Sequence, residues 1–160
     1  EMRQKKDPKS EDYAEVIRGL EKEKITATTI LTMDRVDGCI TTWCSALMPH
    51  LEQWIEIILK KPSAPDPGYF KYRLGRIKTL QHKYLEALNL FQMAHDADPQ
   101  FLHPLFEQIN IFLKLGQIDN AEYTLARLEQ ANAKSRHPRN QELAAIEADI
   151  KRFRKQADQP

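Results

Sequence analysis

The sequence predicts an all-α protein, and three observations lead to this prediction. Glycine is rare, with 5 residues in 160, and long stretches contain no proline. Apolar residues recur at intervals of three and four, which is the spacing of one helix face. The pattern of small and apolar residues around Ala87 returns further along the chain around Ala121. We therefore expect short helices that pack side by side around a continuous apolar core.

The N-terminal third reads as a lead-in followed by helices. Residues 1–9 are polar and predict a flexible lead-in. Ser10 is a candidate N-cap for the first helix of the segment 10–61. Further helices are expected over 26–33 and 40–47. Pro49 suits the first turn of the next helix. That helix carries an apolar stripe of Leu51, Trp54, Ile55, Ile58 and Leu59. We expect the segment 10–61 to pack on the helices that follow.

A proline-rich linker is expected over residues 62–67, where three prolines stand within six residues. Beyond it the spacing predicts four helices, over 69–80, 83–97, 101–115 and 118–132. Gly116 stands between the last two, where a tight turn favours glycine. The segment 134–160 predicts a loop followed by a capping helix over 142–153.

Small residues recur where paired helices would have to cross closely. The shift that places Ala87 on Ala121 also places Phe91 on Leu125. Gly75 and Ala87 leave room for a facing helix, and Pro99 ends the second helix of the first pair. Residues 68–133 therefore read as two helical hairpins related by this shift.

This pattern resembles the tetratricopeptide repeat (TPR) family, whose repeat length equals the shift from Ala87 to Ala121. The residues that match its motif are Leu74, Gly75, Ala87, Phe91, Ala94 and Pro99. The second repeat departs from it, with Gln108 and Ile109 where Leu and Gly are usual. The resemblance implies a right-handed α-solenoid with two repeats over 68–133, N-terminal helices and a C-terminal capping helix. Ordinary helical hairpins without TPR geometry are the alternative.

The resemblance also implies a binding surface for a protein or peptide partner. In TPR arrays the first helix of each repeat lines the concave face. The residues expected there are Tyr69, Tyr72, Arg76, Thr79, His103, Phe106, Asn110 and Leu113. Aromatic residues and arginine dominate binding hot spots, so the set is typical of a peptide groove. The same residues could instead pack under the N-terminal helices or the cap.

The sequence shows no catalytic, cofactor or metal-binding motif. The five histidines are scattered, and no glycine-rich phosphate loop is present. A formal net charge of +1 argues against nucleic acid as a partner. We therefore expect a non-catalytic module that uses no cofactor.

Cys39 and Cys44 are the only cysteines. On a continuous helix their Cα atoms would lie about 8.6 Å apart. A disulfide needs a separation below about 7 Å, so it requires a turn or a broken helix here. Two buried thiols, a disulfide and a metal site that includes His50 all remain open interpretations.

A weaker resemblance covers the order of features along the whole chain. It is similar to the soluble C-terminal domain of bacterial membrane proteins of surface-glycan assembly, such as O-antigen ligases or polymerases. This resemblance implies a periplasmic domain tethered to a membrane domain of the same polypeptide, in which Cys39 and Cys44 could be oxidised. A cytoplasmic adaptor is the competing interpretation. Because the chain opens with Glu1-Met2, we expect it to be a piece of a longer protein.

Overall fold

The computed structural model describes residues 48–61 and 66–159. The predictions for residues 1–47 lie outside the described residues, and those for Cys39 and Cys44 are among them. The chain divides into two compact units, residues 1–66 and residues 67–160. The division falls inside the proline-rich segment 62–67. Each unit is described by itself.

The first unit contributes one described helix, α3 (Met48–Leu59). Pro49 stands in its first turn, which is the position that the sequence predicts. A proline is accommodated there because the first N–H groups of a helix have no partner within the helix. Ile55 and Ile58, from the predicted apolar stripe, are fully buried.

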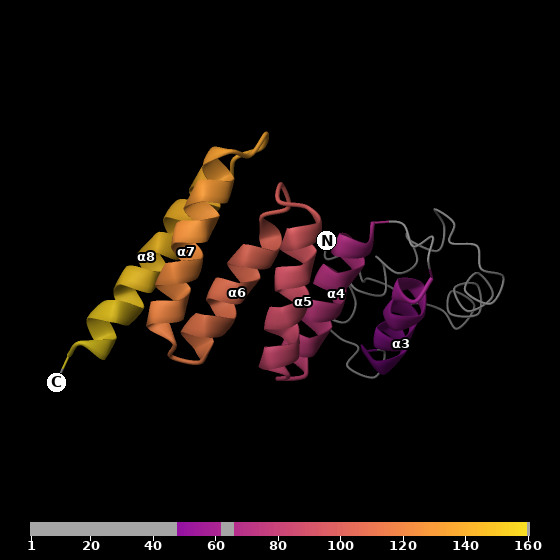
Figure 1. Cartoon of the computed structure of the whole chain (residues 1–160). Coiled ribbons are helices and arrows are strands. Elements are labelled where there is room, and N and C mark those ends of the chain that lie inside the picture. Colours follow the sequence, from indigo (N-terminus) through magenta and orange to yellow (C-terminus); the bar gives the residue numbers. More distant parts are fainter. Residues whose placement is uncertain (1–47, 62–65, 160) are drawn as a thin grey trace, which may run out of the picture. The chain divides into compact units, whose positions relative to one another are not determined.

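The second unit consists of five helices in chain order (Figure 1), and no strand occurs in the part of the chain that the structure describes. They are α4 (Pro67–Leu80), α5 (Tyr84–Ala97), α6 (His103–Lys114), α7 (Ile118–Ala133) and α8 (Asn140–Ala157). The all-α prediction is confirmed for the described residues. Helix α4 begins at Pro67 rather than at residue 69, because proline is well suited to the first turn of a helix. Helix α8 is longer than predicted at both ends.

Each helix of the second unit packs on the next one in the chain. In addition, α6 contacts both α4 and α8, whereas α5 and α7 do not pack on each other. Helices α4, α6 and α8 therefore form one layer of the unit, and α5 and α7 form the other. The first helices of the two predicted hairpins, α4 and α6, both lie in the layer of three helices.

The two hairpin turns have the same backbone geometry. His82 follows α4 with φ of 60°, and Gly116 follows α6 with φ of 70°. The amide of Lys83 donates to the carbonyl of Lys78 at 2.9 Å, and the amide of Gln117 donates to that of Phe112 at 2.8 Å. The shift that relates His82 to Gly116 is the one that relates Ala87 to Ala121. Both helices thus end in a left-handed residue that lets the last carbonyls find donors.

Two apolar clusters lie in the core of this unit, in addition to the buried Phe70, Leu74 and Ile77 of α4. The first joins α4, α5 and α6 through Tyr72, Ala87, Phe91, Ala94 and Ile111. The second joins α6, α7 and α8 through Leu102, Leu105, Ile109, Leu113, Ile118, Ala121, Leu128, Ile146 and Ile150. Helix α6 contributes to both clusters, so it links the two hairpins. Of the five helices, α6 also shows the most marked apolar stripe.

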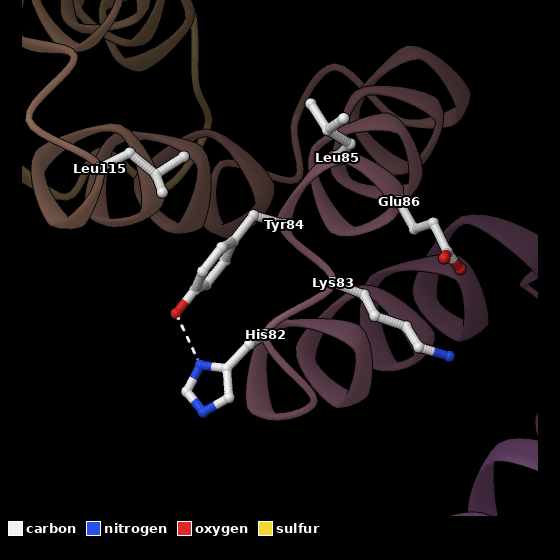
Figure 2. A pocket seen from close by; sticks show the side chains of 6 residues that line it. All are labelled: His82, Lys83, Tyr84, Leu85, Glu86 and Leu115. Atoms are coloured by element: carbon white, nitrogen blue, oxygen red, sulfur yellow. Dashed lines mark hydrogen bonds between the residues drawn. The ribbon is translucent and has the colours of Figure 1, made fainter.

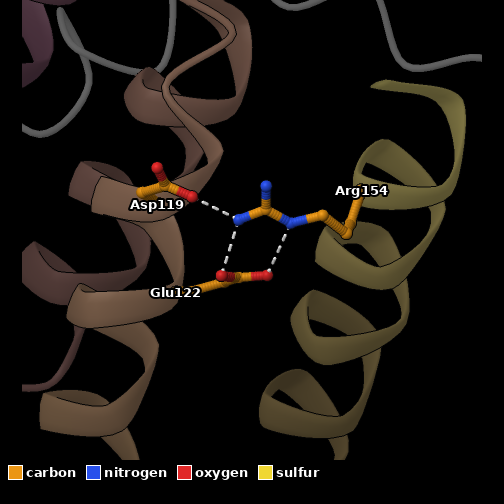
Figure 3. A network of polar contacts seen from close by, with 3 residues as sticks. All are labelled: Asp119, Glu122 and Arg154. Carbon is orange, nitrogen blue, oxygen red and sulfur yellow. Dashed lines mark hydrogen bonds and ion pairs between the residues drawn. The ribbon is translucent and has the colours of Figure 1, made fainter. Parts of the chain in front are cut away.

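Hydrogen bonds and ion pairs connect α8 to α7. Asn132, which is buried near the end of α7, accepts from the Arg139 amide at 2.6 Å and donates to the Asn140 carboxamide oxygen at 2.8 Å. At the other end of α8, Arg154 reaches back to α7 (Figure 3). Its guanidinium binds both oxygens of Glu122, at 3.1 and 2.7 Å, and also donates to Asp119. These contacts hold α8 against α7 along most of its length.

Candidate functional site

The predicted binding residues lie on α4 and α6, in the layer of three helices, but they differ in exposure. Asn110 is exposed. Tyr69, Arg76, Thr79, His103 and Phe106 are half-buried. Tyr72 and Leu113 are buried. The prediction therefore divides into residues that reach the surface and residues that belong to the core.

Tyr72 is a core residue rather than part of an open groove. Only 8% of it is exposed, and its ring meets Phe101 edge-on with a centroid distance of 4.9 Å. The ring of Phe91 lies 5.8 Å away on another side. Phe101 comes from the connection between α5 and α6, so a segment between the repeats closes over Tyr72. The expectation that Tyr72 offers free apolar area to a partner is corrected accordingly.

Leu113 and Thr79 also make contacts within the fold. Leu113 is 6% exposed and belongs to the cluster that joins α6 to α7 and α8. The Thr79 hydroxyl donates to the Gly75 carbonyl one turn earlier, at 2.9 Å. Phe106 packs against the edge of the same cluster as Leu113 while it remains half-buried. Leu113 is therefore removed from the candidate surface, and Phe106 stays on its rim.

A group of charged side chains spans the layer formed by α4, α6 and α8. Arg76 on α4 interacts electrostatically with both His103 and Glu107 on α6. Burial raises the pKa of the Glu107 carboxyl, because the charged form loses hydration, while the positive charge of Arg76 opposes this rise. Glu107 was not among the residues expected from the sequence.

Helix α8 adds a second charged pair to this group. Arg139 and Glu142 form an ion pair, with 3.0 Å between nitrogen and oxygen. Burial lowers the pKa of His103, and the charges of Arg139 and Arg76 lower it further, whereas Glu142 acts in the opposite direction. His103 is therefore affected by positive charge from Arg76 on α4 and from Arg139 at the N-cap of α8. The neutral form of its imidazole is favoured for this reason.

We define the charged face as Arg76, His103, Glu107, Arg139 and Glu142, with Tyr69, Phe106 and Asn110 beside it. One signal for Glu107 is present in the sequence, since it stands four residues after His103 and so shares its helix face. No comparable signal exists for Arg139 and Glu142, because their proximity to His103 depends on how α8 packs on α6. The arrangement can offer hydrogen bonds and ion pairs of both signs to a polar chain segment.

A second surface feature lies at the turn between α4 and α5. Figure 2 shows a shallow pocket lined by His82, Lys83, Tyr84, Leu85, Glu86 and Leu115. A hydrogen bond of 2.8 Å joins His82 Nδ1 to the Tyr84 hydroxyl. Leu85 is 82% exposed, which is unusual for leucine. Its charged lining residues are Lys83 and Glu86, and Glu86 forms an ion pair of 3.1 Å with Lys78 on α4.

No group of three or more metal-binding side chains occurs within 48–61 and 66–159. No helix among those residues is long and apolar enough to cross a membrane. Comparison with protein-family models, with curated proteins and with solved structures gives no match to this chain.

Proposed function

We propose that this chain is a non-catalytic protein-binding module, built on TPR-like hairpins and belonging to a larger protein. The charged face would be its partner-binding surface. The observation that carries this proposal is the gathering of Arg76, His103 and Glu107 from α4 and α6, joined by Arg139 and Glu142 from α8. The charges of Arg76 and Arg139, from different parts of this layer, both act on His103 of α6.

The repeated backbone geometry supports the TPR-like part of the proposal. The two hairpins end their first helices, at His82 and Gly116, in the same left-handed turn with the same hydrogen bonds. Alternate helices also share one layer, as they do when hairpins stack in an array. In such arrays the layer formed by the first helices is an extended surface, which suits a peptide in an extended or helical form.

We expect the partner segment that binds to the charged face to be polar and to carry one apolar anchor residue. Tyr69 and Phe106 are half-buried and present part of their rings at the surface. The neighbouring carboxylate and guanidinium groups supply charges of both signs, so a partner segment with both acidic and basic residues would be matched best. A face of only three helices is short, and therefore we expect modest affinity that decreases with salt.

The test uses the whole chain as bait and compares two double variants. Arg76→Ala/Phe106→Ala removes a charge and a ring from the charged face. Tyr123→Ala/Arg152→Ala removes the same two kinds of group from exposed positions elsewhere on α7 and α8. The captured protein is identified, and the affinity of its synthetic binding segment is measured for each chain.

We expect the first variant to lose most of its affinity and the control to keep it. Equal affinities of the two variants, with both folded by circular dichroism, would place the partner surface elsewhere. Phe106 packs against the core, so Glu107→Gln serves as a milder second variant that preserves side-chain shape. Its affinity should depend less on salt than that of the native chain, since one charge of the face is gone.

A further inference from the structure

A basic pocket lies on the other layer of the unit, away from the charged face. It is formed by the end of α5, the connection that follows it and the second half of α7. The lining residues are His95, Pro99, Gln100, Arg127, Gln130, Ala131 and Lys134. None of these residues is acidic, although aspartates stand close by in the sequence. The pocket thus gathers cations and amides without a carboxylate among them.

Two acidic side chains stand close to the pocket, and each accepts a hydrogen bond from a neighbouring group. Asp96 accepts a hydrogen bond from the Gln92 amide at 2.8 Å. Asp98 accepts from the backbone amide of Gln100 at 2.9 Å. Among the described residues, Arg127 and Lys134 take part in no ion pair and no side-chain hydrogen bond. Arg127 is nevertheless half-buried, which costs a charged group part of its hydration.

Two neighbours are oriented by hydrogen bonds, and one of them, Gln100, keeps a donor available. The Gln100 carboxamide oxygen accepts from the Arg136 backbone amide at 3.0 Å, so its NH₂ group remains as a donor. The His95 Nδ1 donates to the Phe101 carbonyl at 3.2 Å, because a carbonyl oxygen can only accept. Both contacts fix side chains on the α5 side of the pocket opposite Arg127 on α7.

Neutralisation of helix dipoles does not account for the pocket. Helices α5 and α7 both end near it, and each C-terminus carries about half a negative charge. Lys134, at the C-cap of α7, suits that role. Arg127 stands nearly two turns before the end of α7, where the dipole effect has faded. Two full positive charges therefore exceed the combined charge of about −1 from the helix ends, and an anion would still be favoured.

We propose that this pocket binds a phosphoryl group, either free or carried by a larger molecule. A phosphate monoester has a charge of about −1.5 to −2 at neutral pH, which matches the unpaired charges of Arg127 and Lys134. Its oxygens accept several hydrogen bonds, and the guanidinium, ammonium and carboxamide groups supply the donors. A carboxylate has two oxygens rather than three and would use fewer of these donors.

The test is a titration of the full chain with inorganic phosphate, followed by two-dimensional NMR at constant ionic strength maintained with chloride. We expect saturable shifts of the amide signals around Gln100, Arg127 and Lys134, and no shifts around Arg76. The variant Arg127→Gln/Lys134→Gln should bind phosphate at least about tenfold more weakly, because it loses two charge-assisted contacts. The matched control Lys151→Gln/Arg152→Gln removes the same net charge from exposed positions on α8 and should bind as the native chain does.

Three results would overturn the proposal. They are the absence of saturable shifts, equal weakening in the control variant, and acetate binding as tight as phosphate. Titration with phenyl phosphate then distinguishes the sources of the ligand. Binding tighter than that of inorganic phosphate supports a phosphoryl group carried by a larger molecule, and equal binding supports the free ion. This proposal is independent of the partner surface, so each can fail without the other.

Discussion

The ring of Phe91 lies against the backbone of Gly75, so closely that a Cβ atom at Gly75 would stand 2.7 Å from Phe91 Cε1. Phe91 is fully buried on α5, and Gly75 belongs to α4. The two helices of the first hairpin therefore approach at a point where only glycine fits. This contact gives a physical reason for the small residue that the sequence pattern places there.

Gly75→Ala should lower the free energy of unfolding. Alanine favours a helix over glycine by about 1 kcal/mol, whereas overpacking a filled core costs about 1–3 kcal/mol. So short a contact with a buried ring cannot relax freely, and we therefore expect overpacking to dominate. Urea unfolding of the single variant and of Gly75→Ala/Phe91→Leu checks this. The second change should recover part of the loss, and full additivity of the two would contradict the contact.

Ala87→Leu should also lower the free energy of unfolding, for a related reason. Ala87 is fully buried on α5, in the cluster that contains Tyr72 and Phe91. The added volume has no empty space to enter, and we expect a loss of about 1–3 kcal/mol. Ala126→Leu is the matched control, because Ala126 is exposed on α7. Equal melting temperatures for the two variants would count against the packing of the first hairpin.

Asn132→Ala should loosen the connection between α7 and α8. The change removes the acceptor of the Arg139 amide and the donor to Asn140, at a site with little access to water. Loss of such a buried contact costs about 1–3 kcal/mol. Hydrogen exchange should show the largest increase at the start of α8. Asn89→Ala, at an exposed position of α5, should change stability by no more than about 0.5 kcal/mol.

Glu107→Gln should stabilise the chain at neutral pH but not in acid. The pKa of Glu107 is raised in the folded state, because burial disfavours its charge. Its contribution to stability is therefore fully present below the unfolded value of 4.5 and is lost as pH rises through the folded pKa. The advantage of the variant, measured by urea unfolding, should grow as pH rises above 4.5.

His103→Gln tests a pKa shift in the opposite direction on the same charged face. The pKa of His103 is lowered in the folded state, by burial and then by Arg139. The native chain therefore loses stability as pH falls below the unfolded value of 6.5 and through the folded pKa. Relative to the native chain, this variant should become more stable as the pH is lowered, as measured by urea unfolding at several pH values. Identical pH profiles for the two variants would show that the charged face is not assembled as described.

The sequence by itself predicted the number and type of helices after the linker. Their ends fall within a few residues of the expected positions, because turn residues such as Gly116 and Pro99 interrupt a regular apolar spacing. The first turn is harder to recognise, since histidine adopts positive φ less readily than glycine does. The resemblance to TPR proteins and the function that it implies remain predictions.

The tertiary structure decided which residues reach the surface. Helical spacing placed Tyr72 and Arg76 on one face of α4, one turn apart. It could not show that Phe101, from the following connection, covers Tyr72 and leaves Arg76 near Glu107. In the same way, Arg139 and Glu142 come near His103 only because α8 packs on α6. Local periodicity reports the face of a single helix, whereas burial and charge coupling depend on which other helix meets that face.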